Sequence, residues 1–424
     1  MAFATNASDL GTVNPGGHWV RALMFADLVD LFVYEQNPEP EGMMSNQAMK
    51  YPRGKGVAYH KLAQAIHHRR APAVIHASQM GTVLVDVLTK GVATNSWFEA
   101  QSAEAYATNG AYVQYYVSPD NVKRLFLEKC WSGSAEHARF VLSHRDLYEG
   151  ELRSGSLLGV LFLYNERGRT ISGVYPSYLG FAQGLAEGNY PFDVVFAGDG
   201  HYVQDRLAAR DLAPYRVLLV PSPIAPTPGQ QQVVRDYVTS GGTVVCQEPE
   251  ALGLSAALEA QDADMPTCIE GQFTLGKGQV LVLRGAVSPT WTDDVGSNYF
   301  RHYEPRLRDE IGRLAETLGL ERVLPEQSDG LVTAYPLLQP EQHRVVVHLV
   351  NCDIDYEHDM VREKPSVTVQ VDAPSYMRGK LTAQLYTAGG SPESLEVIRA
   401  EGRLSCLVPR LGTYASLVLT SQEP

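Results

Sequence analysis

Short, mostly apolar runs alternate with helical stretches through the first two thirds of the chain, and this alternation restricts the fold more than any other feature. The runs 29–34, 72–77, 158–164 and 216–220 are rich in β-branched, aromatic and leucine residues, and turn residues bound them. Strands that alternate with helices in this way form parallel βα units. The sequence therefore predicts an α/β protein that contains parallel sheet.

Residues 1–152 are predicted to hold four such strands, either as half of an eight-stranded (β/α) barrel or as a small open sheet. Apolar residues repeat every four positions over 58–66, which predicts a helix. A second, alanine-rich helix is expected over 97–108, before a strand at 111–117. We take this stretch as a partial (β/α) barrel.

Residues 153–325 are predicted to form a flavodoxin-like, doubly wound domain, because strands and helices continue to alternate there. Thr227-Pro228 marks the start of one helix and Gly241-Gly242 its end. The turn at 276–278 predicts a hairpin at the edge of the sheet. A last amphipathic helix is expected over 305–318.

Residues 326–424 change to short alternating runs, which predict a small antiparallel β-sandwich. Seven strands are expected, at 331–334, 344–350, 366–371, 381–386, 395–399, 404–408 and 414–420. The acidic segment 351–359 lies between two of them. Its Asp, Glu and His residues suggest a cation site, but they lack the spacing of a calcium loop, and a solvated loop is the preferred interpretation.

Charge and cysteine content exclude several classes of protein. The 48 acidic residues outnumber the 35 basic residues, for a formal net charge of −13, which disfavours nucleic acid and anionic membranes as partners. No stretch approaches the ~20 apolar residues of a membrane helix, and the N-terminus lacks the pattern of a signal peptide. The five cysteines are scattered and odd in number, which argues against a disulfide framework. A cytoplasmic protein without a metal or another cofactor is expected.

"YPFDVVFAGD" (190–199), the run 215–245 and "LGKGQVLVL" (275–283) are similar to the trimerisation domain of family 42 beta-galactosidases. "VVVHLVNCD" (345–353) is similar to the start of the C-terminal sandwich of that family. "DLFVYE" and "PAVIHAS" resemble its sixth and seventh barrel strands. The resemblance implies a carbohydrate ligand and either a homo-oligomer or a second chain that completes the barrel.

Two departures from the family pattern concern its catalytic glutamates. No residue precedes Met1, so the first four barrel strands, with the acid/base glutamate on the fourth, are expected to be absent. The family's nucleophile lies at the end of the seventh strand, where this chain has His76-Ala77-Ser78.

In βα folds the residues at the C-terminal ends of strands face the ligand, and this rule selects the candidate site. Glu35 ends an apolar strand and is the candidate general acid, because burial there would raise its pKa. Asp9 is the candidate second carboxylate. The candidate sugar-binding residues are Asn6, His76, Trp97, Gln114 and Tyr116, which would donate or accept hydrogen bonds or stack on a sugar ring.

Competing interpretations remain for these residues. Glu35 would also fit as a solvated or ion-paired strand end, His76 as a structural histidine, and the aromatic residues as core. Glu99 and Glu104 are expected to be surface charges on their helix. The middle domain also resembles class I glutamine amidotransferases in fold, but Cys246 lacks the glycine-flanked turn of their nucleophile.

The preferred function is therefore a glycoside hydrolase-like protein that hydrolyses or binds glycosides through carboxylates at barrel strand ends. The alternative is a non-catalytic sugar-binding or assembly subunit that pairs with a missing barrel half.

Overall fold

In the computed structural model the chain forms two compact units. One comprises 1–34, 61–69 and 156–321, and the other comprises 35–60, 70–155 and 322–424. The structure describes residues 4–8, 31–35, 53–67, 73–75, 95–108, 132–149, 153–164, 174–201, 203–221, 226–256, 266–284, 305–327, 330–355 and 357–422. No helix within these residues is long and apolar enough to cross a membrane.

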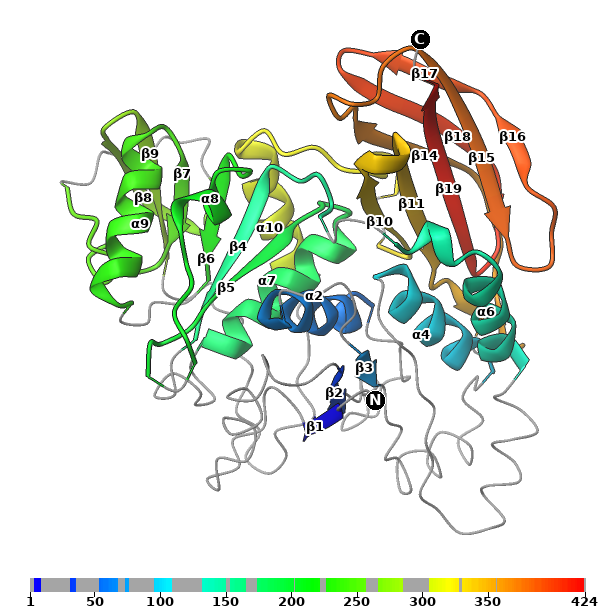
Figure 1. The fold of residues 1–424 in the computed structure, drawn as a ribbon, viewed down its shortest axis with the longest axis horizontal. Helices are drawn as coiled ribbons and strands as arrows, with labels where there is room; N and C mark the ends of the chain where they lie inside the picture. The colour runs from blue at the N-terminus through cyan, green and yellow to red at the C-terminus, as the bar shows by residue number, and fades with distance from the viewer. Residues whose placement is uncertain are drawn as a thin grey trace. The chain divides into compact units, whose positions relative to one another are not determined.

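The first unit is built on a six-stranded sheet in the order β5-β4-β6-β7-β9-β8 (Figure 1). Neighbouring strands from β5 to β9 are parallel, and β8 pairs antiparallel with β9. Every residue of β4, β6 and β7 is buried, as expected for parallel strands that are covered on both faces. The strands are β4 (Leu158–Leu163), β5 (Asp193–Ala197), β6 (Val217–Val220), β7 (Thr243–Cys246), β8 (Ile269–Leu275) and β9 (Gly278–Leu283).

The predicted signals for helix α9 (Pro228–Thr239) are confirmed. Thr227 accepts the N–H of Gln230 at its hydroxyl, and the Gln230 side chain accepts the N–H of Thr227 in return. The other helices of this unit are α7 (Val174–Glu187), α8 (Ala209–Leu212) and α10 (Pro305–Thr317). Helices α7 and α10 pack together, and the hydroxyl of Tyr190, just after α7, donates to the carbonyl of Gly312 in α10.

The predicted hairpin between β8 and β9 is also confirmed, and its glycines are required by close packing. Gly276 has a φ of 65°, and a Cβ there would lie 2.7 Å from Thr239 Cα. A Cβ on Gly278 would lie 2.2 Å from the carbonyl oxygens of Val238 and Gly242. The hairpin turn therefore rests directly on the end of α9.

The second unit contains two antiparallel sheets that share one apolar core. The larger has the order β10-β11-β19-β15-β16 and the smaller has the order β14-β18-β17. The strands are β10 (Val332–Gln339), β11 (Arg344–Asn351), β14 (Lys364–Asp372), β15 (Lys380–Thr387), β16 (Glu393–Leu395), β17 (Val397–Ala400), β18 (Arg403–Leu411) and β19 (Tyr414–Gln422). Inward valines of β11 and β14 alternate with outward residues, as the sequence predicted.

Two sequence predictions for this unit need correction. The run 395–399 is not one strand, because it divides at Glu396 into the end of β16 and the start of β17, which belong to different sheets. The segment 351–359 is not a simple loop, because β12 (Ile354–Asp355) lies in it and pairs antiparallel with β13 (Met360–Val361), which directly follows it.

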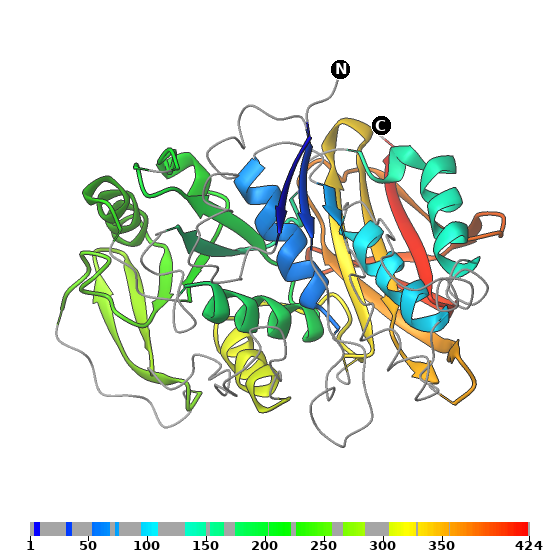
Figure 2. The same cartoon turned by 90° about the horizontal axis from the view of Figure 1, so that it is seen from below.

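The N-terminal part contributes a three-stranded sheet in the order β1-β2-β3, in which β1 and β2 lie side by side (Figure 2). These strands are β1 (Ala4–Ser8), β2 (Leu31–Glu35) and β3 (Ala73–Ile75). The predicted helices are present as α2 (Lys55–His67) and α4 (Asn95–Ala107), followed by α6 (Ser132–Ser143) and the short 3₁₀ helix η1 (Arg145–Leu147). The strand predicted at 111–117 lies outside the described residues.

Helices α4 and α6 pack on each other and on the five-stranded sheet of the second unit, on the face opposite its core. The mixed α/β class with parallel and antiparallel sheets is thus confirmed. The barrel and flavodoxin-like assignments and the domain boundaries stay predictions.

Candidate functional site

The structure places the backbones of three candidate site residues on defined elements. Asn6 lies in β1, Glu35 is the last residue of β2, and Trp97 lies in the first turn of α4. Glu35 therefore ends a strand, as the sequence predicted. Asp9, His76, Gln114 and Tyr116 lie outside the described residues, although β3 ends at Ile75, directly before His76.

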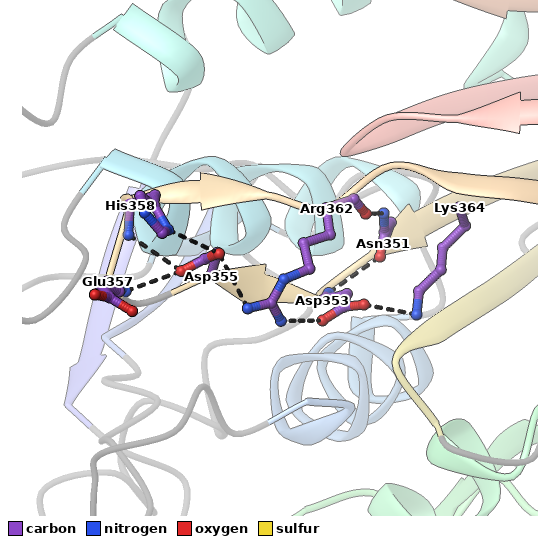
Figure 3. A network of polar contacts seen from close by, with 7 residues as sticks. All are labelled: Asn351, Asp353, Asp355, Glu357, His358, Arg362 and Lys364. Carbon is purple, nitrogen blue, oxygen red and sulfur yellow. Dashed lines mark hydrogen bonds and ion pairs between the residues drawn. The ribbon is translucent and has the colours of Figure 1, made fainter.

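The acidic segment around β12 and β13 forms a network of ion pairs (Figure 3). Arg362 bridges Asp353 and Asp355, with N–O distances of 3.3 and 3.0 Å, and Lys364 pairs with Asp353 at 2.6 Å. Asp355 also accepts the backbone N–H of His358, and the His358 ring lies 3.1 Å from its carboxylate. These hydrogen bonds lower the pKa of Asp355 to about 2.

The side chains of Arg362 and Lys364 therefore neutralise Asp353 and Asp355, the carboxylates that were candidate ligands for a metal cation. Among the residues that the structure describes, no group of three or more His, Cys, Asp or Glu side chains is arranged to hold a metal ion.

Asp359, in the same segment, has a different role that the sequence did not reveal. Its carboxylate accepts the backbone N–H groups of Asn95 and Ser96, at 3.1 and 3.0 Å, and the Ser96 hydroxyl at 2.9 Å. These donors lie at the start of α4, where backbone N–H groups lack partners within the helix and the helix dipole favours negative charge. Asp359 thus fixes the end of α4 that carries Trp97.

Glu104 is not the surface charge that the sequence predicted. It is 2% exposed, and its carboxylate accepts the N–H of Gly54, immediately before α2, at 2.7 Å. Close by, the ring of the buried His60 hydrogen bonds to the hydroxyl of Thr108. A buried carboxylate thus holds the start of α2, as Asp359 holds the start of α4.

Glu99 is also only partly exposed, and it faces a histidine. Its carboxylate accepts the Thr413 hydroxyl at 2.6 Å and lies 4.0 Å from Nε2 of His137 in α6. Nδ1 of His137 lies 2.9 Å from the hydroxyl of Ser102. Ser102, His137 and Glu99 are thus arranged in the order of a catalytic triad. Ser102 is fully buried, however, and cannot reach a substrate as a nucleophile.

A second buried polar group lies between η1 and the five-stranded sheet. The hydroxyls of Tyr148 and Tyr414 are 2.5 Å apart, and the Tyr414 hydroxyl lies 2.9 Å from Nδ1 of His348. The ring of His348 stacks on Tyr148 with centroids 4.7 Å apart. Burial lowers the pKa of His348 to about 3, so the neutral ring makes these contacts at physiological pH.

Cys246, the candidate nucleophile of an amidotransferase, is unsuited to that role. Cys246 is the last residue of β7 and is 1% exposed. Burial, reinforced by the charge of Glu250, raises the pKa of its thiol to about 12. A reactive cysteine needs a lowered pKa and access to its substrate, so Cys246 does not provide amidotransferase chemistry.

Comparison with known proteins finds structures with a similar fold but no family with a similar sequence. No family model matches the sequence, and no curated protein matches it significantly. Among solved structures, a beta-galactosidase from Rahnella sp. R3 superposes with a TM-score of 0.52 and 13% identity, over 96% of this chain and 63% of its own. A beta-galactosidase from Bacillus circulans sp. alkalophilus gives 0.53 and 12%, over 93% and 61%.

A catalytic mutant of a GH42 beta-galactosidase from G. stearothermophilus gives a TM-score of 0.52 and 12% identity, over 100% of this chain and 64% of its own. The chain thus spans less than two thirds of the length of these structures. At such identities the similarity establishes the fold, which resembles that of GH42 beta-galactosidases.

Proposed function

We propose that this chain is a carbohydrate-active protein of the glycoside hydrolase type. The observation that supports the proposal most is the similarity of its fold, over nearly its whole length, to beta-galactosidases. One fold hosts many functions, so the assignment of individual residues is part of the proposal. In this interpretation 1–152 form part of a (β/α) barrel, 153–325 a flavodoxin-like domain and 326–424 the sandwich.

Glu35 is the proposed general acid. It is the last residue of β2, and in βα folds such positions line the ligand site. A general acid would protonate the leaving oxygen of the glycosidic bond, while a second carboxylate attacks the sugar or activates a water molecule. Asp9, or a carboxylate of a neighbouring chain, is the proposed second group.

The remaining candidate residues would bind the sugar. Asn6, His76 and Gln114 would hydrogen bond to its hydroxyl groups, and Trp97 and Tyr116 would stack on the apolar face of its ring. Trp97 lies in the turn of α4 that Asp359 holds, so its backbone is well anchored. Such anchoring favours a binding position, because a preorganised backbone loses less entropy on binding.

A panel of chromogenic glycosides tests the proposal with the wild-type chain, Glu35→Gln and a matched control, Glu396→Gln. Glu396 is exposed between β16 and β17, so its substitution should leave activity unchanged. Loss of a general acid lowers turnover by about 10²–10⁴-fold, and we expect Glu35→Gln to fall in that range. Equal activity of Glu35→Gln and wild type would remove Glu35 from the mechanism.

A second candidate is a non-catalytic sugar-binding or assembly subunit. It is favoured by the segment "PAVIHAS", which has His76 where the resembling family has its nucleophilic glutamate. Binding of sugars without hydrolysis, weakened by Trp97→Ala, would support it. Mass photometry then tests whether the chain forms a homo-oligomer or needs a second chain as its partner.

A further inference from the structure

The surroundings of Glu99 bring three carboxylates to the interface of α4, α6 and the five-stranded sheet. Asp359 lies at the first turn of α4, and Glu99 lies one turn further along the same helix. Glu136, next to His137 in α6, is the third, and its charge acts on Glu99 together with that of Asp359. Three negative charges around one helix end repel one another unless one of them carries a proton.

The hydrogen bonds and the exposure of the three carboxylates indicate which of them carries the proton. Asp359 accepts three hydrogen bonds at a helix N-terminus, and both features stabilise its ionised form. Glu136 is exposed to solvent. Glu99 is largely buried and accepts one hydroxyl, from Thr413, so it is the group best suited to hold the proton.

The tautomer of His137 supports the same assignment. The Ser102 hydroxyl donates its one proton to the carbonyl of Glu99, at 2.9 Å, so Nδ1 of His137 must be the donor to Ser102. Nε2 of the neutral ring then presents a lone pair toward the Glu99 carboxyl, 4.0 Å away. A lone pair opposite a carboxylate is repulsive, and one proton on either group removes that repulsion.

We propose that Glu99 and His137 form a proton-dependent latch, in which a proton held by the Glu99 carboxyl stabilises the packing of α4 and α6 on the turn before β19. The latch joins Glu99 of α4, His137 of α6 and Thr413 of that turn. Other titratable or charged groups on or against these packed elements include Glu104, Tyr106, Glu136, Arg139, Tyr148, His348, Asp359 and Tyr414, whose ring lies 5.6 Å from that of His137. Arg139 is the cation among them, and burial lowers the pKa of His348 to about 3.

The direction of the pH effect follows from the pKa of each partner. Burial raises the pKa of Glu99, Glu136 and Asp359 raise it further, and the Thr413 hydrogen bond lowers it in part. A raised pKa means that Glu99 contributes its full stability below the ordinary carboxyl pKa and loses it as pH rises through the raised value. Burial lowers the pKa of His137 to about 4, so its contribution is lost in the opposite direction, as pH falls through about 4.

Glu99→Gln isolates the first of these effects, because the amide keeps an acceptor for Thr413 and cannot ionise. Urea unfolding of wild type and Glu99→Gln between about pH 4 and pH 8 is the test, with hydrogen exchange of residues 95–107 as the local readout. We expect the stability of wild type relative to Glu99→Gln to fall as pH rises. A difference between the two proteins that stays constant with pH would overturn the latch.

Glu136→Gln provides a second test on an exposed side chain. Removing its negative charge should lessen the loss of stability at high pH in the wild-type background and have no such effect in Glu99→Gln. An equal effect in both backgrounds would contradict the proposal. NMR titration of the Glu99 carboxyl in wild type serves if Glu99→Gln does not fold, and an ordinary carboxyl pKa there would also overturn it.

Discussion

Asp359→Asn is the perturbation whose cost can be worked out most directly from the structure. The carboxylate accepts two donors of Ser96 at one oxygen and the N–H of Asn95 at the other. An asparagine keeps one oxygen, so the contacts to Ser96 survive, while the Asn95 N–H loses its acceptor at a cost of about 1 kcal/mol. Loss of the charge at the helix N-terminus adds about 0.5–1 kcal/mol.

The expected destabilisation of α4 is therefore about 2 kcal/mol, which corresponds to roughly 30-fold faster hydrogen exchange of its amides. Asparagine is the appropriate substitution because Asp359 has a φ of 50°, a left-handed conformation that asparagine tolerates and alanine does not. Hydrogen exchange with mass spectrometry over residues 95–107 is the assay.

Asp372→Asn is the matched control for this experiment. Asp372 ends β14 and pairs with Arg403 through a side chain that is 54% exposed, so its substitution should leave exchange in α4 unchanged. Unchanged exchange of α4 in Asp359→Asn, or equal acceleration in both variants, would refute the role assigned to Asp359.

Two further predictions concern the first unit. Gly276→Ala should lower the melting temperature by more than Gly402→Ala. Both glycines have a positive φ, but only at Gly276 would the new Cβ meet the backbone, 2.7 Å from Thr239 Cα. Equal shifts of the melting temperature in the two variants would contradict this. Cys246 and Cys268 should resist alkylation in the native protein at pH 8, because burial raises the pKa of each thiol to about 12. Peptide mapping after brief iodoacetamide treatment checks this, and rapid labelling of either cysteine would show that the thiol is accessible.

The parallel strands were predictable from the sequence because their burial leaves a direct trace in composition. Strands such as β4 and β6 are covered on both faces, so nearly every residue is apolar, whatever the partners are. The start of α9 was predictable because a capping box is local, with Thr227 and Gln230 only three residues apart. Glu35 at the end of β2 followed from the same kind of local pattern.

The buried carboxylates could not be predicted, because their partners are remote in the sequence. Asp359 contacts Ser96 over a separation of 263 residues, and Glu99 contacts Thr413 over 314. One signal was present: alanine and serine make up much of α4, and such small residues are typical of a helix that packs closely on several sides. The division of the run 395–399 between two sheets was equally hidden, because alternation does not show which sheet a strand joins.

We expect this chain to act on or bind carbohydrate, and saturation-transfer difference NMR with a panel of galactosides tests this most directly. We expect saturation transfer to the sugar protons in the wild-type chain and a weaker signal in Trp97→Ala, with Glu396→Gln as the unchanged control. Absence of transfer to any sugar, with the protein folded and the control identical to wild type, would contradict it.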